Sequence, residues 1–202
     1  MKRLFDIVLS GLGLIATAPV FVLLCAAILI RDGRPIFYVS ERMKTPTEPF
    51  ALIKFRTMSN ADASQNTGVT GGDKANRITP MGRFLRRTRL DELPQLINVL
   101  KGDMSLVGPR PPLRRYTDLA PDLYAQVLTC KPGITGLATL HFHAHEERLI
   151  AQATTPSETE AIYVRRCVPR KARLDLIYKD HANVCYDAAI LWQTLRKVIR
   201  SV

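Results

Sequence analysis

Cysteine is scarce in this chain of 202 residues, and the four that occur lie far apart in the sequence. Cys25, Cys130, Cys167 and Cys185 show neither the spacing of a metal site nor the pattern of a disulfide framework. We therefore expect reduced thiols in a protein that faces the cytosol. At this length the chain suits one domain with its own core, apart from whatever the N-terminal segment does.

Acidic residues are also few. Lysine and arginine number 29 against 18 aspartates and glutamates, which gives a net charge of +11 and a pI of about 9.9. Such a balance indicates an anionic partner, which could be nucleic acid, acidic lipid or a phosphorylated substrate. The chain lacks aromatic residues interleaved with basic ones, the pattern that stacks on bases, and this argues against a nucleic-acid-binding module.

Charge is absent altogether from residues 7–30. As a helix this run would be about 36 Å long at about 1.5 Å per residue, which is enough to cross a bilayer. It exceeds the apolar core of a signal peptide and reaches Arg31 without a clear cleavage site, so we expect it to be retained. The run is therefore predicted to insert in a membrane and to contact its lipids.

Pro19, which follows Ala18 near the middle of the run, blocks one backbone hydrogen bond and predicts a kink. Basic residues flank both ends, and positive charge prefers the cytoplasmic side. A helix–break–helix hairpin would keep both basic ends in the cytoplasm, whereas a straight span would send one pair across. The sequence alone favours the hairpin only slightly and leaves both open. The flanking residues are Lys2, Arg3, Arg31 and Arg34.

An acidic pair, Asp91 and Glu92, lies among arginines in residues 80–112. Apolar residues then recur with the period of an amphipathic helix, which Gly102 would end and in which Pro94 fits only the first turn. The acids would lie at the helix entrance, where negative charge is favoured. Neighbours on a helix do not share a face, so we expect them to play different roles. The periodic residues are Leu93, Leu96, Ile97 and Leu100, and the arginines are Arg83, Arg86, Arg87, Arg89 and Arg110.

Prolines surround Arg110 in residues 108–112, and they fix the backbone so that its guanidinium is held out for a bidentate partner such as phosphate. The plainer interpretations are surface ion pairs for the acids and a solvated arginine for the turn. A turn followed by a short strand is predicted in residues 33–42, and a second strand at residues 50–58. In the second, Lys54 and Arg56 share a face, which suits either an anion site or a charge-protected edge strand.

Residues 59–76 are polar and glycine-rich, and we interpret them as a mobile loop. A short helix is predicted at residues 121–128. His141, His143 and His145 alternate and would share a face of a strand, where they could ligate zinc. No distant fourth ligand is apparent, so we favour a surface loop without an assigned role.

The last predicted helix carries an apolar stripe with Trp192 beside basic residues. Core packing is the usual meaning of such a stripe, but a basic amphipathic helix with a tryptophan can also rest on an anionic membrane. We favour membrane contact.

Residues 78–87 and 90–111 resemble, without gaps, the signature of the bacterial sugar transferases, the monotopic phosphoglycosyl transferases. Residues 33–38, 54–58, 131–138 and 174–178 resemble further motifs of that family. Two positions depart from its pattern: Ala18 replaces the usual serine before Pro19, with Thr17 as the nearest hydroxyl, and Thr139 replaces a glutamine near the expected nucleotide site.

The resemblance implies an enzyme that transfers a sugar 1-phosphate from a UDP-sugar to undecaprenyl (polyprenyl) phosphate and releases UMP. Asp91 would be the nucleophile, and Mg²⁺ would be held by Asp91, Glu92 or both. The phosphates would be bound by Lys54, Arg56, Arg86 and Arg110, while Asp175 is a weaker candidate that could act in substrate binding or support an arginine.

The predicted fold class is α+β and mostly helical. Residues 1–31 would form a re-entrant membrane helix, and residues 32–202 a compact cytoplasmic catalytic domain with a few short strands. The active site would lie on the cytoplasmic face of the bacterial inner membrane. The sugar cannot be read from the sequence, and the formation of a homodimer stays open. The rival functions are a membrane phosphatase for lipid diphosphates and a basic, membrane-anchored binding module.

Overall fold

The computed structural model describes residues 1–59 and 76–201. Helices predominate and the strands are few and short, so the predicted mostly helical class is confirmed. The elements are α1 (Lys2–Arg31), β1 (Phe37–Met43), β2 (Pro49–Phe55), α2 (Pro80–Thr88), the 3₁₀ turn η3 (Leu90–Glu92), α3 (Gln95–Lys101), β3 (Ser105–Val107), α4 (Arg114–Leu119), α5 (Pro121–Val127), β4 (Gly133–Thr135), α6 (Leu137–Ile150), α7 (Pro156–Ile162), the π-helical turn η4 (Tyr163–Cys167), α8 (Val168–His181) and α9 (Val184–Ser201).

Two small sheets organise the domain. Strands β1 and β2 form an antiparallel hairpin in which Tyr38 is opposite Lys54, and β3 pairs with β4 in parallel. The second pair needs glycine, because a Cβ on Gly133 would lie 2.1 Å from the backbone nitrogen of Gly108. The close approach of the two backbones places the proline-rich segment, residues 108–112, against the start of β4.

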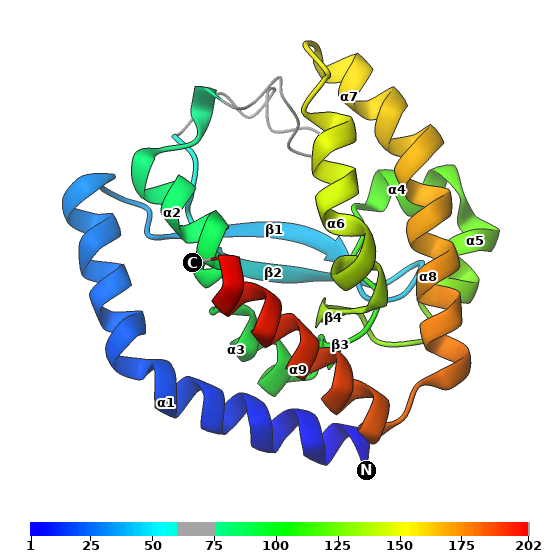
Figure 1. Ribbon diagram of the computed structural model, residues 1–202, viewed down its shortest axis with the longest axis horizontal. Coiled ribbons are helices and arrows are strands. Elements are labelled where there is room, and N and C mark those ends of the chain that lie inside the picture. The colour runs from blue at the N-terminus through cyan, green and yellow to red at the C-terminus, as the bar shows by residue number, and fades with distance from the viewer. Residues whose placement is uncertain (60–75, 202) are drawn as a thin grey trace.

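Helix α1 is bent sharply near its middle but remains one continuous helix, so the predicted break is a kink (Figure 1). Pro19 has no N–H to donate to the carbonyl of Ile15. Two residues before Pro19, the hydroxyl of Thr17 donates to the carbonyl of Gly13 at 2.7 Å, a bond that also tends to bend helices. Within the described residues α1 is the one helix that is long and apolar enough to cross a membrane.

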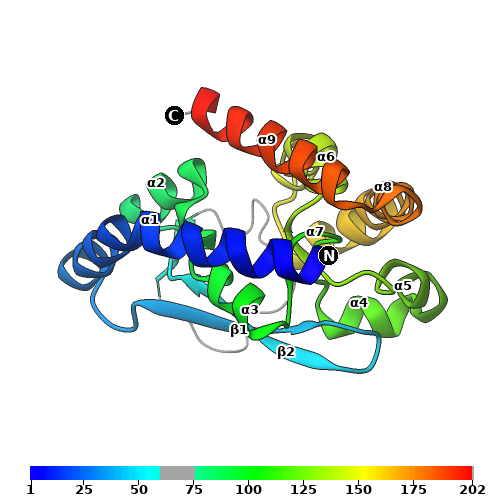
Figure 2. The ribbon, with the colours of Figure 1, turned by 90° about the horizontal axis from the view of Figure 1, so that it is seen from below.

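Both ends of α1 are bonded to the rest of the domain. At the N-terminal end, Lys2 donates to the carbonyl of Val107 at 3.1 Å and forms an ion pair with Asp187. The buried carboxylate of Asp6 accepts a hydrogen bond from the backbone N–H of Leu106 at 3.0 Å. Figure 2 shows α1 between the β1–β2 hairpin and α9.

At the C-terminal end, Leu24 and Ile28 are buried against Phe55 and Leu85, and the hydroxyl of Thr79 donates to the carboxylate of Asp32 at 2.8 Å. The apolar bend therefore projects between two anchored ends.

Several local predictions can be compared with these elements. The helix at residues 121–128 is confirmed, and Gly102 ends α3 in the left-handed conformation, with φ of 94°. The second strand ends at Phe55, earlier than predicted, and residues 60–75 of the predicted loop lie outside the described residues.

The surface-loop and strand interpretations of residues 141–147 are wrong, because these residues lie within α6. Polar residues dominate that stretch, but Leu140, Phe142 and Ile150 are buried and hold the helix against the domain.

Candidate active site

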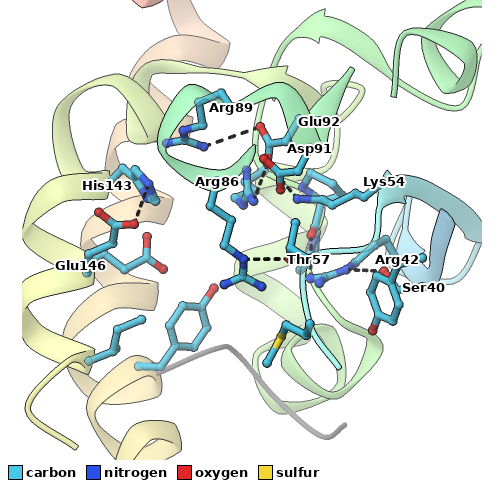
Figure 3. Close-up of a pocket in the computed structure, with 18 of the residues that line it drawn as sticks. Ser40, Arg42, Lys54, Thr57, Arg86, Arg89, Asp91, Glu92, His143 and Glu146 are labelled. Atoms are coloured by element: carbon cyan, nitrogen blue, oxygen red, sulfur yellow. Dashed lines mark hydrogen bonds and ion pairs between the residues drawn. The ribbon is translucent and has the colours of Figure 1, made fainter. Parts of the chain in front are cut away.

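One cavity of about 440 Å³ lies between the β1–β2 hairpin, η3, the proline-rich segment after β3, and the helices α5, α6 and α8 (Figure 3). Every residue predicted for catalysis or substrate binding lines it, although these residues are as far apart in sequence as Lys54 and Asp175. Both acids of the pair face this cavity, so the expectation that they lie on separate faces is wrong.

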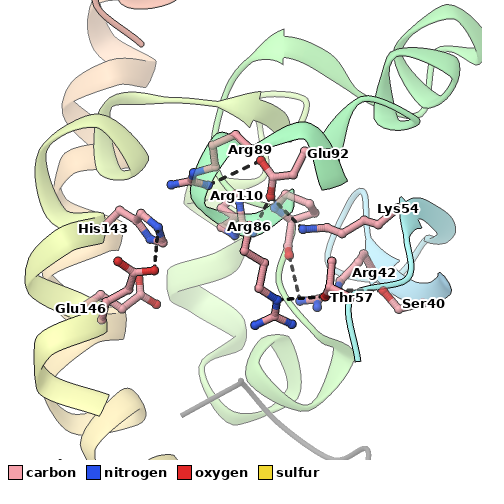
Figure 4. Close-up of polar contacts among 12 residues, drawn as sticks. Ser40, Arg42, Lys54, Thr57, Arg86, Arg89, Glu92, Arg110, His143 and Glu146 are labelled. Carbon is pink, nitrogen blue, oxygen red and sulfur yellow. Dashed lines mark hydrogen bonds and ion pairs between the residues drawn. The ribbon is translucent and has the colours of Figure 1, made fainter. Parts of the chain in front are cut away.

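Glu92 is the centre of a cluster of cations (Figure 4). One oxygen accepts from Lys54 Nζ at 2.8 Å and from Arg110 Nη2 at 3.0 Å, and the other faces Arg89 at 3.6 Å. Burial alone would raise the pKa of this carboxyl, but Lys54 and Arg110 outweigh it and hold the pKa well below its usual range. Glu92 is therefore ionised and committed to its neighbours.

Asp91 is equally buried, at 8% exposed, but it forms no hydrogen bond or ion pair with any described residue. Burial, and next the adjacent charge of Glu92, raise the pKa of Asp91, while Lys54 and Arg86 partly oppose this rise. The two carboxyls thus have opposite environments, which is typical of acid pairs with divided roles. Of the two acids, Asp91 is therefore the one whose carboxylate is available to bind a ligand.

The backbone around the pair explains this placement. Thr79 caps the N-terminus of α2 by accepting from the N–H of Gly82, and α2 ends at Arg89, whose φ of 60° is left-handed. That turn reverses the chain into η3, and Pro94 precedes α3. Gly82 lies so close to the carbonyl of Thr57 that a Cβ would be 2.0 Å away, which fixes α2 against the strand segment.

Arg110 is positioned by the rigid segment that the sequence indicated. The carbonyl of Pro109 accepts from the N–H of Gly133 at 2.8 Å, and that of Pro112 accepts from Met43 at 3.0 Å. The carboxylate of Glu92 raises the pKa of the Arg110 guanidinium, which stays charged in the cavity.

Two other predicted arginines differ in what they contact. The Nε of Arg86 donates to the hydroxyl of Thr57 at 2.9 Å, and its guanidinium extends into the middle of the cavity (Figure 3). Arg56 also lines the cavity, but it donates to the carbonyls of Asp32 and, at 2.8 Å, Gly33. Arg56 therefore ties the end of α1 to the site.

The opposite wall holds ionisable residues that sequence reasoning missed. Glu146 of α6 accepts from Lys171 of α8 at 2.9 Å, and Lys171 also reaches the hydroxyl of Tyr163 at 3.3 Å. Burial raises the pKa of the nearby Asp175 to about 7. No local pattern could have identified Glu146 and Lys171, because only the packing of α6 on α8 brings them together.

The histidines do not form a metal centre. His143 lines the cavity and its Nε2 lies 3.2 Å from the carboxylate of Glu147, whereas His145 contacts Arg170 at 3.1 Å. Among the residues that the structure describes, no three metal-ligating side chains gather at one point. The four cysteines are all unpaired, in agreement with the sequence.

A magnesium ion is typically held by one or two carboxylates together with phosphate oxygens and water. Asp91 fits this role because its carboxylate has no partner among the described residues. Glu92 fits poorly, since both of its oxygens face cations. The residues present therefore fit a magnesium ion held by one protein carboxylate and a phosphorylated substrate.

Comparison with known proteins gives one family. The model of the bacterial sugar transferase family matches residues 1–201. The sugar transferase EpsL of Bacillus subtilis, described as uncharacterized, is 36% identical over 201 residues, which cover 100% of this chain and 88% of EpsL.

Two longer relatives are also similar. The undecaprenyl-phosphate galactose phosphotransferase of Salmonella typhimurium is 42% identical over 155 residues, covering 68% of this chain and 32% of the relative. The undecaprenyl-phosphate glucose phosphotransferase of Komagataeibacter xylinus is 34% identical over 210 residues, covering 99% of this chain and 36% of the relative. The chain thus spans most of EpsL and about a third of the other two.

Proposed function

Because this chain belongs to the bacterial sugar transferase family, we propose that it moves a sugar 1-phosphate from a UDP-sugar to undecaprenyl phosphate and releases UMP. The names of the relatives from Salmonella and Komagataeibacter support the acceptor and the type of transfer. The observation that carries the proposal is the carboxylate of Asp91, which has no partner among the described residues and lies in a cavity lined by Lys54, Arg86 and Arg110. That arrangement suits a phosphoryl centre, where positioning and charge neutralisation matter most.

The reaction would proceed in two displacements. A carboxylate oxygen of Asp91 attacks the phosphorus that carries the sugar, and the bond from that phosphorus to the oxygen of UMP breaks. The phosphate oxygen of the polyprenyl acceptor then attacks the same phosphorus and frees the carboxylate. The raised pKa of Asp91 favours this role, because a more basic carboxylate is a better nucleophile.

The remaining side chains would hold the substrates. Arg86 and Arg110 neutralise the diphosphate, and Lys54 adds a third positive charge. Glu92 positions Lys54 and Arg110 by pairing with both. When bound by Asp91, Mg²⁺ would neutralise charge on the phosphate oxygens.

The membrane arrangement follows from α1. Its two ends are bonded to one domain, which supports a re-entrant helix with both ends on the same side of a bilayer. Helix α9 also exposes apolar side chains, which alternate with arginines in the sequence and would rest on anionic lipid. We place residues 32–202 on the cytoplasmic face of the inner membrane. The exposed set includes Leu12, Ile15, Val22 and Leu23 of α1 and Trp192, Leu195 and Ile199 of α9.

The deciding experiment is intact-protein mass spectrometry after incubation with UDP-sugars. Wild-type protein should gain the mass of a sugar phosphate, and Asp91→Asn should gain none while still folding and inserting. Appreciable transfer by the Asp91→Asn variant would remove Asp91 as the nucleophile. A phosphatase would release phosphate from a lipid diphosphate and no UMP from the donor. A reporter at residue 1 that reached the far side of the membrane would contradict the re-entrant arrangement.

A further inference from the structure

The cavity has two chemically different walls. The wall formed by β2, η3 and the proline-rich segment carries the cations and the acidic pair. The wall formed by α5, α6, η4 and α8 combines apolar and aromatic side chains with two pairs, the half-buried Lys171–Glu146 and the more exposed His143–Glu147, and with the buried carboxyl of Asp175. Figure 3 places Glu146 of this second wall across the cavity from Lys54. The lining residues of the second wall include Tyr124, Ile150, Tyr163, Lys171 and Asp175.

Asp175 stands out on the second wall because its buried oxygen lacks a donor. The residue is 5% exposed, and its Oδ1 accepts no hydrogen bond from the described part of the chain. Lys171, one helical turn earlier, is near enough in sequence to donate to this oxygen, but its ammonium is bound to Glu146 and to the hydroxyl of Tyr163. A buried acceptor without a donor is unfavourable, so a structure that keeps one on a cavity wall points to a ligand.

The chemistry of the carboxylate restricts what that ligand can be. A carboxyl group is a poor partner for a phosphate, and the arginines of the other wall are better placed to bind one. An acceptor needs a donor, and the hydroxyl groups of a sugar ring present several at adjacent carbons. Apolar and aromatic side chains beside the carboxylate suit the faces of such a ring.

We propose that Asp175 binds a sugar ring of the nucleotide-sugar donor by accepting hydrogen bonds from its hydroxyl groups, with the Lys171–Glu146 pair closing the same subsite. The inference rests on the proposed function, because it places the donor's diphosphate at Arg86 and Arg110. Hydroxyl groups occur on both the transferred hexose and the ribose of the nucleotide. Asp175 would act in binding and would take no part in the displacement at Asp91.

The test compares Asp175→Asn with wild-type protein, both full-length and reconstituted in lipid nanodiscs. Asn has nearly the same size but replaces one carboxyl oxygen with an NH₂ group, which cannot accept a hydrogen bond. Asp180→Asn is the matched control, because it makes the same change on an exposed residue of the same helix. Binding of UDP-glucose, UDP-galactose, UDP and 2′-deoxy-UDP would be measured by calorimetry, and transfer rates would be measured with whichever UDP-sugar labels the wild type.

We expect Asp175→Asn to raise the KM for the donor by about 10- to 100-fold, which is the usual loss when a buried hydrogen-bonding group is left without its partner, with kcat changed by less than about threefold. Asp180→Asn should change neither value. If the hexose is bound, affinity for the UDP-hexose falls and affinity for UDP does not. If the ribose is bound, both fall, and 2′-deoxy-UDP binds wild type and variant equally.

Equal affinity of variant and wild type for every nucleotide would overturn the inference, as would an equal loss of affinity for UDP-sugars, UDP and 2′-deoxy-UDP. A fall in kcat with unchanged KM would also count against it. These results differ from failure of the proposed function, in which wild-type protein gains no sugar phosphate from any UDP-sugar. If the wild type gains a sugar phosphate and Asp175→Asn binds the nucleotides as tightly as the wild type, only the proposed sugar subsite at Asp175 is wrong.

Discussion

Replacing Glu92 by glutamine separates the structural acid from the reactive one. The substitution keeps the size of the side chain but removes the charge that Lys54 and Arg110 approach at 2.8 and 3.0 Å. Those two cations, with Arg89 at 3.6 Å, would then face one another with only the carboxyl of Asp91 to offset their repulsion. Asp91→Asn is the natural comparison, because it removes a charge of the same sign from the adjacent residue.

The magnitude follows from burial. Breaking a buried ion pair by removing one partner costs about 3–5 kcal/mol. The side chains of Lys54 and Arg110 are 17% and 34% exposed, so water screens part of the repulsion and the lower value applies. For a chain of this size about 3 kcal/mol lowers the melting temperature by roughly 6–12 °C. Asp91→Asn should leave the melting temperature unchanged or raise it, because it removes a desolvated charge that has no partner among the described residues.

The assay is thermal unfolding of the reconstituted protein at neutral pH, extended by a double-mutant cycle. Lys54→Met should destabilise the wild type, since it leaves Glu92 with less compensation. In the Glu92→Gln background the same change should stabilise the protein, because it removes a repelling cation. Equal effects of Lys54→Met in the two backgrounds, or a Glu92→Gln melting temperature within about 2 °C of wild type, would refute the reasoning.

Three further outcomes are expected. Burial raises the pKa of Asp175 from 3.8 to about 7, so the folded state binds a proton that the unfolded state has already lost. The free energy of unfolding should therefore fall by up to about 3 kcal/mol as the pH rises from 5 to 7. Asp175→Asn should remove this pH dependence from a series of urea denaturations. Gly133→Ala would place a Cβ 2.1 Å from a backbone nitrogen and should cost about 3 kcal/mol or more, measured as a lower urea midpoint, whereas Gly11→Ala meets nothing within 4 Å and should not. Asp187→Ala removes the ion pair of Lys2 and should speed amide exchange in the first turns of α1, while exchange in α6 stays unchanged.

Local signals predicted the parts of this site that are contiguous in sequence. Helix α3, its glycine end and the rigid arm of Arg110 depend on residues within one stretch of the chain, where periodicity and proline geometry are decisive. The resemblance then added Lys54, Arg86 and Asp175, and the structure brings all three to the same cavity.

Features that depend on contacts between distant segments could not be predicted from local sequence patterns. Glu146 and Lys171 meet only because α6 packs on α8, and a single sequence carries no mark of that contact. The histidines were misread because their alternation imitates a strand, whereas burial of Leu140 and Phe142 makes the segment helical. The roles of Asp91 and Glu92 likewise depend on cations that come from three separate segments.

The ion pair between Lys2 and Asp187 joins positions that are 185 residues apart in the sequence. A ribosome must therefore have added residue 187 before the start of α1 can settle into its place. Until then the apolar helix lacks one of the partners of its N-terminal end, and lipid is the best environment available to it. Delivery to the bilayer during translation would shelter that unfinished intermediate, and prolonged exposure to water would leave it open to aggregation.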